Sequence, residues 1–191
     1  MSFQNIEVAQ IAAVSENYCI GKNNDLPWHI KADLQHFKKM TADSEKVSQD
    51  IQGIVIMGRK TFESMGSKPL PKRMNVIVTT QTDFAKANNL TDYKNIIVAH
   101  SLDDALNQAA DFAKNLELLT VWVIGGERLF TEALPVTDRV ELTHVATTID
   151  DGDAFYPKLP DDFTQSQKSE KMQDDNSGLS FQFVTYQRQS N

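Results

Sequence analysis

Short apolar runs rich in β-branched residues recur along most of the chain, and segments with helical periodicity lie between them. Apolar runs of roughly four to eight residues are typical of buried strands, whereas the helical period indicates amphipathic helices. Alternation of the two predicts a largely parallel sheet with helices on its faces. The expected strands are residues 8–14, 54–57, 76–78, 96–99 and 121–124, and the expected helices are 32–40, 60–65, 101–114 and 128–134.

The last part of the chain has a different pattern. Apolar and polar side chains alternate over residues 140–145, which is typical of a strand with two different faces. The same alternation over 179–183 follows the turn-rich segment 174–178, and this combination is typical of a hairpin. We therefore predict an α/β fold: a central mixed, mostly parallel sheet with an antiparallel C-terminal hairpin, flanked by about four helices. The polar segment 42–53 is interpreted as a surface loop.

Composition and charge narrow the class of protein. A length of 191 residues with 40% hydrophobic and 24% charged residues is typical of one globular domain, here expected over residues 1–191. The formal net charge of −7 argues against a nucleic-acid or anionic-membrane partner. The single cysteine, Cys19, suits a reducing compartment. Without a basic, apolar leader or a membrane-length apolar run, the protein is expected to be cytoplasmic, and no metal site is expected.

One carboxylate stands on an otherwise apolar helix face. Ile30, Asp33, Leu34 and Phe37 share this face by helical spacing. An ionised carboxylate removed from water needs hydrogen-bond donors, so Asp33 needs a partner if the face is buried. Two interpretations remain open: Asp33 stays solvated in the first helical turn, or it binds a flat heterocycle through two parallel N–H groups.

Several blocks of sequence, taken in order, resemble the dihydrofolate reductase family. Each block is short, and the specific signal is that all of them occur in the same order almost to the C-terminus. The blocks are Ile-Ala-Ala at 11–13, Ile-Gly at 20–21, Leu-Pro-Trp at 26–28, Ala-Asp-Leu at 32–34 with Phe37, Met-Gly-Arg-Lys-Thr-Phe-Glu-Ser at 57–64, Pro-Leu-Pro-Lys-Arg-Met-Asn at 69–75, Val-Ile-Gly-Gly at 123–126 and Leu-Thr-His at 142–144.

The resemblance implies NADPH-dependent reduction of 7,8-dihydrofolate to tetrahydrofolate, by hydride transfer to pterin C6 with protonation of N5. In such a site Asp33 binds the pterin and promotes that protonation, and Arg73 pairs with the glutamate α-carboxylate. A planar guanidinium suits this because it can form two parallel hydrogen bonds. The implied catalytic residues are Asp33, Trp28 and Thr143, and the implied substrate-binding residues are Ile11, Ala12, Asp33, Leu34, Phe37, Met65, Leu70, Arg73 and Thr143.

The cofactor implied by the resemblance is NADPH, and a local basic cluster would hold its phosphates. Gly58 precedes Arg59 and Lys60 at a strand-to-helix junction, where backbone N–H groups favour an anion. Gly125 and Gly126 would let the backbone approach the cofactor closely. Residues 20–26 would form a loop closing over it. The implied cofactor-binding residues are Ala13, Ile20, Gly21, Gly58, Arg59, Lys60, Thr61, Ser64, Thr79, Thr80, Gln81, Ile124, Gly125, Gly126, Glu127, Arg128, Leu129 and Phe130.

Three other functions compete with this one. A P-loop kinase is suggested by Gly53, Gly58 and Lys60-Thr61, but Arg59 intrudes and the intervening residues are typical of a strand. The fold-related pyrimidine reductase of riboflavin synthesis would not be expected to carry the 28–33 block or the Arg73 turn. A non-catalytic nucleotide-binding module would need no carboxylate at Asp33. Phe130 departs from the tyrosine of many bacterial members, and by resemblance the protein is expected to be a monomer.

Overall fold

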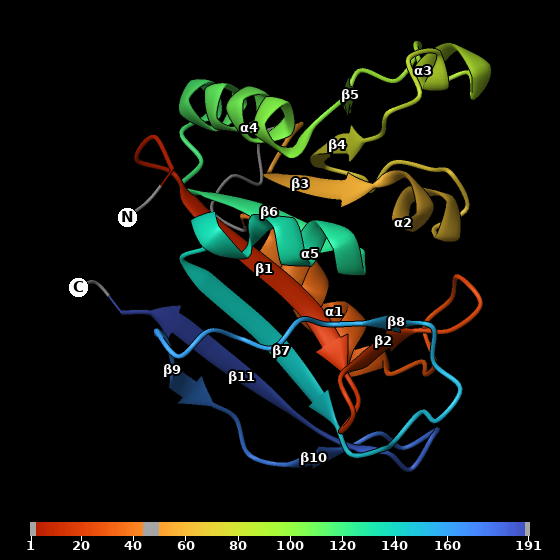
Figure 1. The fold of residues 1–191 in the computed structure, drawn as a ribbon, viewed down its shortest axis with the longest axis vertical. Helices are drawn as coiled ribbons and strands as arrows, with labels where there is room; N and C mark the ends of the chain where they lie inside the picture. The colour runs from red at the N-terminus through yellow and green to blue at the C-terminus, as the bar shows by residue number, and fades with distance from the viewer. Residues whose placement is uncertain (1–2, 44–49, 190–191) are drawn as a thin grey trace.

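A mixed sheet forms the centre of the protein (Figure 1). The computed structural model describes residues 3–43 and 50–189, and within them nine strands form this sheet. They are β1 (Glu7–Val14), β3 (Gly53–Gly58), β4 (Arg73–Val78), β5 (Ile96–Ala99), β6 (Thr120–Gly125), β7 (Arg139–Val145), β9 (Phe163–Lys168), β10 (Met172–Gln173) and β11 (Ser180–Arg188). Their order is β10-β11-β7-β1-β6-β3-β4-β5, and β9 also pairs with β11. Neighbours from β7 to β5 are parallel, whereas β11 runs antiparallel to β7, β9 and β10.

Helices cover both faces of the sheet. They are α1 (Lys31–Thr41), α2 (Arg59–Ser64), α3 (Phe84–Ala87), α4 (Leu102–Leu116) and α5 (Glu127–Ala133), followed by the short 3₁₀ helix η2 (Leu134–Val136). Ile54 and Ile56 of β3 pack in one core with α4 and α5, whereas Val55 and Met57 pack in a second core with α2 and α3. Residues of α1 pack against this second core. The two-residue period of the strand thus builds one core on each face, and each fully buried aliphatic side chain contributes roughly 1.5–3 kcal/mol.

The predicted fold class is confirmed, including the antiparallel hairpin of β10 and β11. Every strand and helix expected from the pattern is present. Ser101 caps the first turn of α4, since its Oγ accepts a hydrogen bond from the Asp104 N–H at 3.1 Å. β4 begins at Arg73, earlier than expected, because its first buried residues include Arg73 and Asn75, whose polarity hides them from an apolar pattern.

Two short strands that the pattern did not predict form a separate ribbon. β2 (Cys19–Gly21) pairs with β8 (Ala154–Phe155), and a bridge between Lys22 and Asp25 closes the loop that follows β2. The Asn23 N–H donates to Asp153 Oδ2 at 2.8 Å. Strands this short cannot show a period. The loop implied at residues 20–26 is therefore anchored on one side to the segment around β8.

The structure also tests the P-loop alternative and, in part, the surface loop expected at residues 42–53. Gly53 to Gly58 form the buried strand β3, so these glycines do not form a phosphate-binding loop. Of the loop expected at 42–53, residues 44–49 lie outside the described part of the chain. In the described ranges, no helix has the length and apolar character needed to cross a membrane.

Candidate active site

The ends of the parallel strands meet at one edge of the sheet. Gly58 at the end of β3 pairs with Val78 at the end of β4, and Met57 pairs with Gly125 at the end of β6. Ligands of parallel sheets bind beyond the carboxyl ends of the strands. The segments implied in cofactor binding follow these ends: 58–64 after β3, 79–81 after β4 and 124–130 at the end of β6. Ala13 of β1 pairs with Thr143 of β7 toward the same edge.

Asp33 lies in the first turn of α1 and is half-buried. Burial raises the pKa of its carboxyl above the ordinary value, and a hydrogen bond from the buried Thr143 hydroxyl offsets part of that rise. Thr143 belongs to β7, so two distant parts of the chain meet at this carboxylate. These surroundings favour the ligand-binding interpretation of Asp33 over a fully solvated residue that only complements the helix dipole.

Trp28 brings an unpaired donor to the same region. Its side chain is buried in a cluster with Ile30, against which Ala13 and Ala32 pack. Within the described residues, its indole Nε1 has no hydrogen-bond partner. Buried donors are rarely left unpaired, so this one suits a site that binds a polar ligand or water.

The apolar face of α1 is not fully covered by the protein core. Leu34 is 53% exposed, and Phe37 is half-buried. Phe37, Met65 and Leu70 pack around the same core that contains Ile11. The structure thus brings together side chains from α1, the end of α2 and the segment before β4, and it leaves one of them, Leu34, accessible. An apolar ring bound against Leu34 would complete its burial.

Arg73 is a buried cation with no anionic partner in the described residues. It is 4% exposed, its Nη1 donates to Thr41 Oγ1 at 2.9 Å, and its Nε donates to the Pro71 carbonyl at 3.0 Å. The guanidinium also lies 6.0 Å from the centre of the Phe37 ring. Burial lowers the pKa of Arg73. Since both named acceptors are neutral, the remaining N–H groups suit a ligand carboxylate.

A corner of two glycines lies where β6 meets α5. The peptide bond between Gly125 and Gly126 is cis. A Cβ added to Gly126 would lie 3.3 Å from Thr61 Oγ1, and one added to Gly125 would lie 3.4 Å from the same atom and 3.5 Å from the Phe130 ring. Side chains at these positions would fill the space between β6 and α2. Gly126 is partly exposed, whereas Gly125 is buried. Without side chains at these two positions, a ligand beside the start of α5 could approach the backbone closely.

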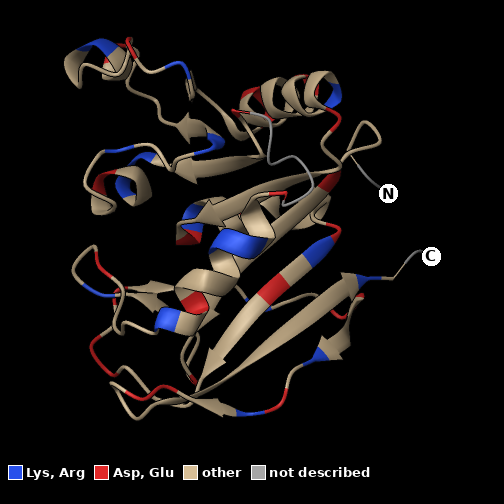
Figure 2. Cartoon of the chain, turned by 180° about the vertical axis from the view of Figure 1, so that it is seen from behind, with Lys and Arg blue, Asp and Glu red and all other residues tan. Residues whose placement is uncertain are grey.

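Both arginines implied in phosphate binding have an acidic neighbour. Arg59 donates to both carboxylate oxygens of Glu63, at 2.7 and 2.8 Å, and Arg128 pairs with Glu132 at 2.6 Å. Lys60 is exposed. Seen from the side of α1, basic and acidic residues are interspersed over the described parts of the chain (Figure 2). If Arg59 and Arg128 bind phosphate, each must exchange its intramolecular carboxylate partner for the ligand.

Comparisons with known proteins now decide the family. The sequence profile described as dihydrofolate reductase matches residues 7–188. The chain is 36% identical to dihydrofolate reductase type 3 of Salmonella typhimurium, covering 95% of the chain and 98% of that protein. It is 33% identical to dihydrofolate reductase of Bacillus subtilis, covering 96% and 95%. A solved structure of dihydrofolate reductase from Enterococcus faecalis, complexed with NADP(H) and RAB-propyl, superposes with a TM-score of 0.77 at 29% identity over 100% of both chains.

The chain belongs to the dihydrofolate reductase family. The resemblance found in the sequence is thus confirmed, and with it an NADPH-dependent oxidoreductase of this family. The family match decides against the fold-related pyrimidine reductase. The roles of individual residues stay predictions, to which the geometry gives the positions described above.

Two implied residues of this family's site have side chains that point elsewhere. Ala12 packs against the core under α4 and α5, on the other face of β1 from Ile11. Leu129 is buried in that same core. Adjacent strand residues point to opposite faces, so at most the backbone of Ala12 faces the ligand side.

In the segment after β4, Thr79 is buried, and its Oγ1 accepts a hydrogen bond from the Gln81 N–H at 3.2 Å. Thr80 and Gln81 are exposed.

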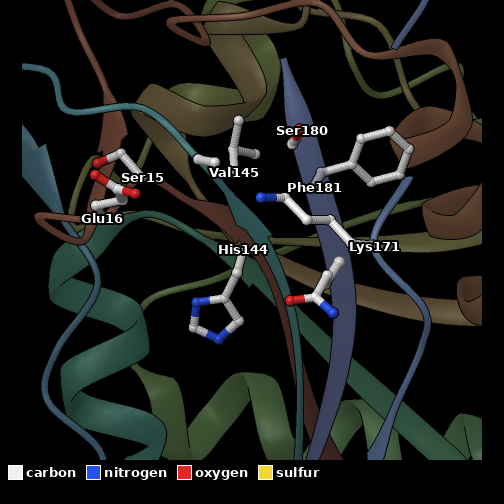
Figure 3. Close-up of a pocket in the computed structure, with 9 residues that line it drawn as sticks. Ser15, Glu16, His144, Val145, Lys171, Ser180 and Phe181 are labelled. Atoms are coloured by element: carbon white, nitrogen blue, oxygen red, sulfur yellow. The ribbon is translucent and has the colours of Figure 1, made fainter. Parts of the chain in front are cut away.

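Two cavities are lined by residues other than the implied site residues. One, of about 240 Å³, opens beside His144, with Lys171 and Glu16 in its lining (Figure 3). His144 follows Thr143 on β7 and so points to the other face of the sheet. A second, of about 490 Å³, lies where His36 of α1 faces Arg139 and Glu141 of β7. No cluster of His, Cys, Asp or Glu in the described ranges could hold a metal ion.

The segment around β8 is a part of the site region that the sequence pattern missed. The Phe155 N–H donates to Glu127 Oε2 at 3.1 Å, at the start of α5, and the Asp153 N–H donates to the Gly21 carbonyl at 3.1 Å. This segment therefore joins the loop after β2 to α5. Its only sequence signal is Gly152, whose lack of a side chain makes room for Cys19.

Proposed function

We propose that this chain reduces 7,8-dihydrofolate to tetrahydrofolate with NADPH at the carboxyl edge of its parallel strands. The observation that carries the proposal is Asp33, a half-buried carboxyl with a raised pKa, placed by α1 beside the Thr143 hydroxyl. The reaction is that of the family, and we propose which residues of this chain perform it.

Asp33 orients the pterin and favours its protonation. A carboxylate accepts two parallel hydrogen bonds from the ring's N3 and 2-amino group, and its negative charge favours a cation at N5. The Thr143 hydroxyl holds the carboxylate in place. Because partial burial weakens competition from water, this interaction is stronger than it would be in solvent. The unpaired Trp28 Nε1 donates a further hydrogen bond on the ligand side.

The rest of the substrate is held by apolar contact and by one cation. Leu34, Phe37, Met65 and Leu70 contact the p-aminobenzoyl ring, and Arg73 pairs with the glutamate α-carboxylate. The exposure of Leu34 and the missing anionic partner of Arg73 support this arrangement. Ligand binding would compensate a buried charge that the protein itself leaves uncompensated.

NADPH, when bound, supplies the hydride that goes to pterin C6. The Gly125-Gly126 corner and Thr61 provide room for the cofactor at the end of β6, and Arg59, Lys60 and Arg128 are the cations for its phosphates. Ala13 and Ile20 contribute apolar contact, and the loop after β2 excludes water. A cation for the adenosine 2′-phosphate favours NADPH over NADH.

The test is a direct assay. The protein is mixed with NADPH and dihydrofolate, and the absorbance of the reduced nicotinamide is followed; turnover that NADH supports far less well is expected. NADPH binding without substrate is measured separately by fluorescence. Cofactor binding with no consumption of dihydrofolate would instead indicate a non-catalytic nucleotide-binding module.

We further infer that one domain, residues 1–191, acts as a monomer in the cytoplasm without a nucleic-acid partner. The free thiol of Cys19 supports the cytoplasmic location, because reducing compartments keep thiols unpaired. The formal net charge of −7 argues against a nucleic-acid partner.

A further inference from the structure

A closed polar network lies beneath the Gly125-Gly126 corner, on the face of the sheet covered by α5. Gln10 of β1 is fully buried. Its Nε2 donates to the Phe130 carbonyl at 3.0 Å and to Thr137 Oγ1 at 2.9 Å, and its Oε1 accepts the Tyr156 hydroxyl at 2.6 Å. Both amide N–H groups and the amide oxygen therefore have partners.

A buried amide is an unusual choice at this position. The neighbouring β1 side chains on this face, Val8 and Ala12, are apolar and pack in the same core. An apolar side chain at position 10 would avoid the cost of removing an amide from water. A satisfied polar network specifies one geometry more strictly than apolar packing does, so the network points to a group whose position matters.

That group is Phe130. Its carbonyl is held by Gln10, and its ring lies 4.9 Å from the Tyr156 ring, centre to centre. The same Phe130 ring packs against Gly125, within 3.5 Å of where a Cβ would stand. Phe130 thus forms one wall of the glycine corner, and Thr61 forms the other. A shift of the Phe130 ring would therefore change the space beside Gly125 directly.

Tyr156 also connects the corner to the ribbon of β2 and β8. Its N–H donates to the Tyr18 carbonyl at 2.8 Å, just before β2. The adjacent Phe155 N–H donates to Glu127 at the start of α5. The hydroxyl of Tyr156 is therefore attached to a backbone that is fixed on both sides.

We propose that Gln10 and Tyr156 are positioning residues for NADPH, which act by holding Phe130 against the Gly125-Gly126 corner. This inference rests on the proposed function, because it concerns the same cofactor site. Neither residue touches the ligand: Gln10 and Tyr156 are both buried under α5. Their effect belongs to cofactor affinity and not to the pterin, which binds on the other face with Asp33.

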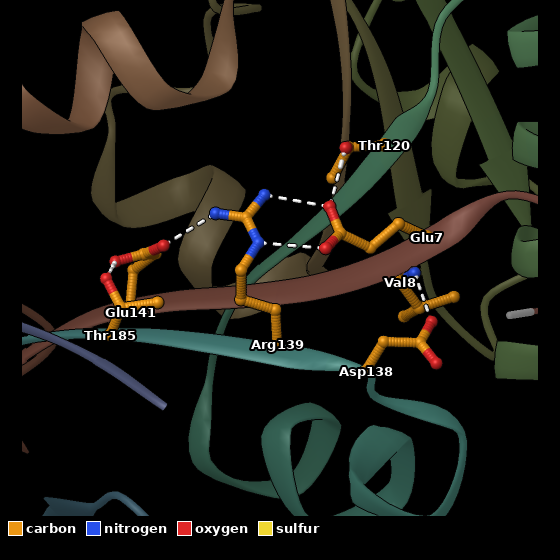
Figure 4. Close-up of polar contacts among 7 residues, drawn as sticks. All are labelled: Glu7, Val8, Thr120, Asp138, Arg139, Glu141 and Thr185. Carbon is orange, nitrogen blue, oxygen red and sulfur yellow. Dashed lines mark hydrogen bonds and ion pairs between the residues drawn. The ribbon is translucent and has the colours of Figure 1, made fainter. Parts of the chain in front are cut away.

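The test measures NADPH dissociation constants by fluorescence for Tyr156→Phe and Gln10→Met, together with thermal unfolding of the cofactor-free proteins. Tyr156→Phe removes the hydroxyl that donates to Gln10, and Gln10→Met removes the amide and all three of its hydrogen bonds. We expect the NADPH Kd to rise by about tenfold, the scale of one net hydrogen bond, with dihydrofolate affinity unchanged. The matched control is Thr185→Val, which removes the hydroxyl that donates to buried Glu141 at 2.7 Å (Figure 4). Thr185 lies on β11, which β7 and β1 separate from β6 and its glycine corner. This variant should lower Tm similarly and leave the NADPH Kd unchanged.

The double variant Gln10→Met/Tyr156→Phe separates positioning from stability. In the double variant the Phe130 carbonyl still accepts from the Leu134 N–H, and the Thr137 hydroxyl still donates to the Ala133 carbonyl. No buried group is left without a partner, so Tm should recover toward the wild-type value. NADPH affinity should stay low, because the Phe130 carbonyl then keeps only the Leu134 N–H and is no longer tied to β1 through Gln10. If affinity recovers together with Tm, or if the single variants bind NADPH as wild type does, the inference is overturned. Wild-type protein that binds no NADPH would instead refute the proposed function.

Discussion

At the scale of single residues, Asp33 combines a catalytic demand with a cost in stability. Its folded-state pKa lies above the ordinary value because burial disfavours the charged form. The folded protein therefore binds this proton more tightly than the unfolded chain does. As pH rises from the ordinary carboxyl pKa through the raised one, Asp33 ionises and therefore subtracts from the free energy of unfolding.

Asp33→Asn should therefore separate activity from stability. The amide keeps the shape but cannot favour a cation at N5, so the hydride-transfer rate at neutral pH should fall by roughly 10²–10⁴, the usual effect of losing a proton-transfer group. Thermal unfolding at pH 7 should show equal or greater stability, because a desolvated charge is removed. Near-normal turnover at pH 7 would take Asp33 out of the mechanism.

Arg73 is expected to act on substrate binding alone. Arg73→Leu should weaken dihydrofolate affinity by about one to two orders of magnitude, since a charged hydrogen bond contributes about 1.5–3 kcal/mol. NADPH affinity should not change. Fluorescence titration with each ligand measures both affinities, and a loss of NADPH affinity would show that Arg73 has been assigned to the wrong ligand. Arg73→Lys is the matched variant, because it keeps the charge and loses the planar fork.

At the scale of elements, α4 offers a test of local sequence rules far from the site. Ser101 caps its first turn through the Asp104 N–H. Ser101→Ala should lower the free energy of unfolding by about 1 kcal/mol, because that N–H loses its acceptor. Chemical denaturation measures the loss, and Ser101→Asp should largely restore it. A negligible effect of the alanine would mean that solvent replaces the cap at no cost.

Strands and helices could be predicted from the sequence where their buried side chains form an apolar run or recur with the period of a helix. The runs in β3 and β6 are apolar on both faces because helices cover both. The helical period over 101–114 matches α4, on which Ala105, Leu106 and Ala109 are buried. The ribbon of β2 and β8 was not predictable, because it is too short to have a period. Nor was α3, which has a single helical turn.

The resemblance names residues for the candidate site but does not give the orientation of their side chains. The resemblance singled out Ile11 and Ala12 together, yet only the strand register shows that their side chains enter different cores. Gln10 gave no signal, because a lone glutamine in an apolar run does not reveal its partners. Those partners, Phe130, Thr137 and Tyr156, are separated from it by most of the chain and meet it only in the folded protein.

At the scale of the whole molecule, one charged network joins the strands of the sheet's centre. Arg139 of β7 pairs with Glu7 of β1 at 2.8 Å and with Glu141 at 2.5 Å (Figure 4). Thr120 of β6 and Thr185 of β11 donate to the two carboxylates. The alternating pattern at 140–145 indicated a polar face, and the structure shows that this face is buried too. Partners on four strands make that burial possible.

Removing the central cation should destabilise the protein in a way that depends on pH. Arg139→Met leaves buried Glu141 and half-buried Glu7 without their partner, so the free energy of unfolding at pH 7 should fall by about 3 kcal/mol. Burial alone would raise the pKa of Glu7, but Arg139 outweighs it, and that pKa lies below its ordinary value of 4.5.

A carboxyl with a lowered folded pKa stabilises the protein above its unfolded pKa, and this contribution is lost as pH falls through the folded value. The difference between wild type and Arg139→Met should therefore shrink as pH drops below 4.5, where protonation removes the unpaired charge of Glu7. Denaturant unfolding across that range measures the difference. The matched control is Arg128→Met, whose pair with Glu132 is largely exposed and should leave stability almost unchanged at any pH. A difference that stayed constant with pH would mean that Arg139 contributes through packing on Trp122, 4.8 Å from its guanidinium, and not through its charge.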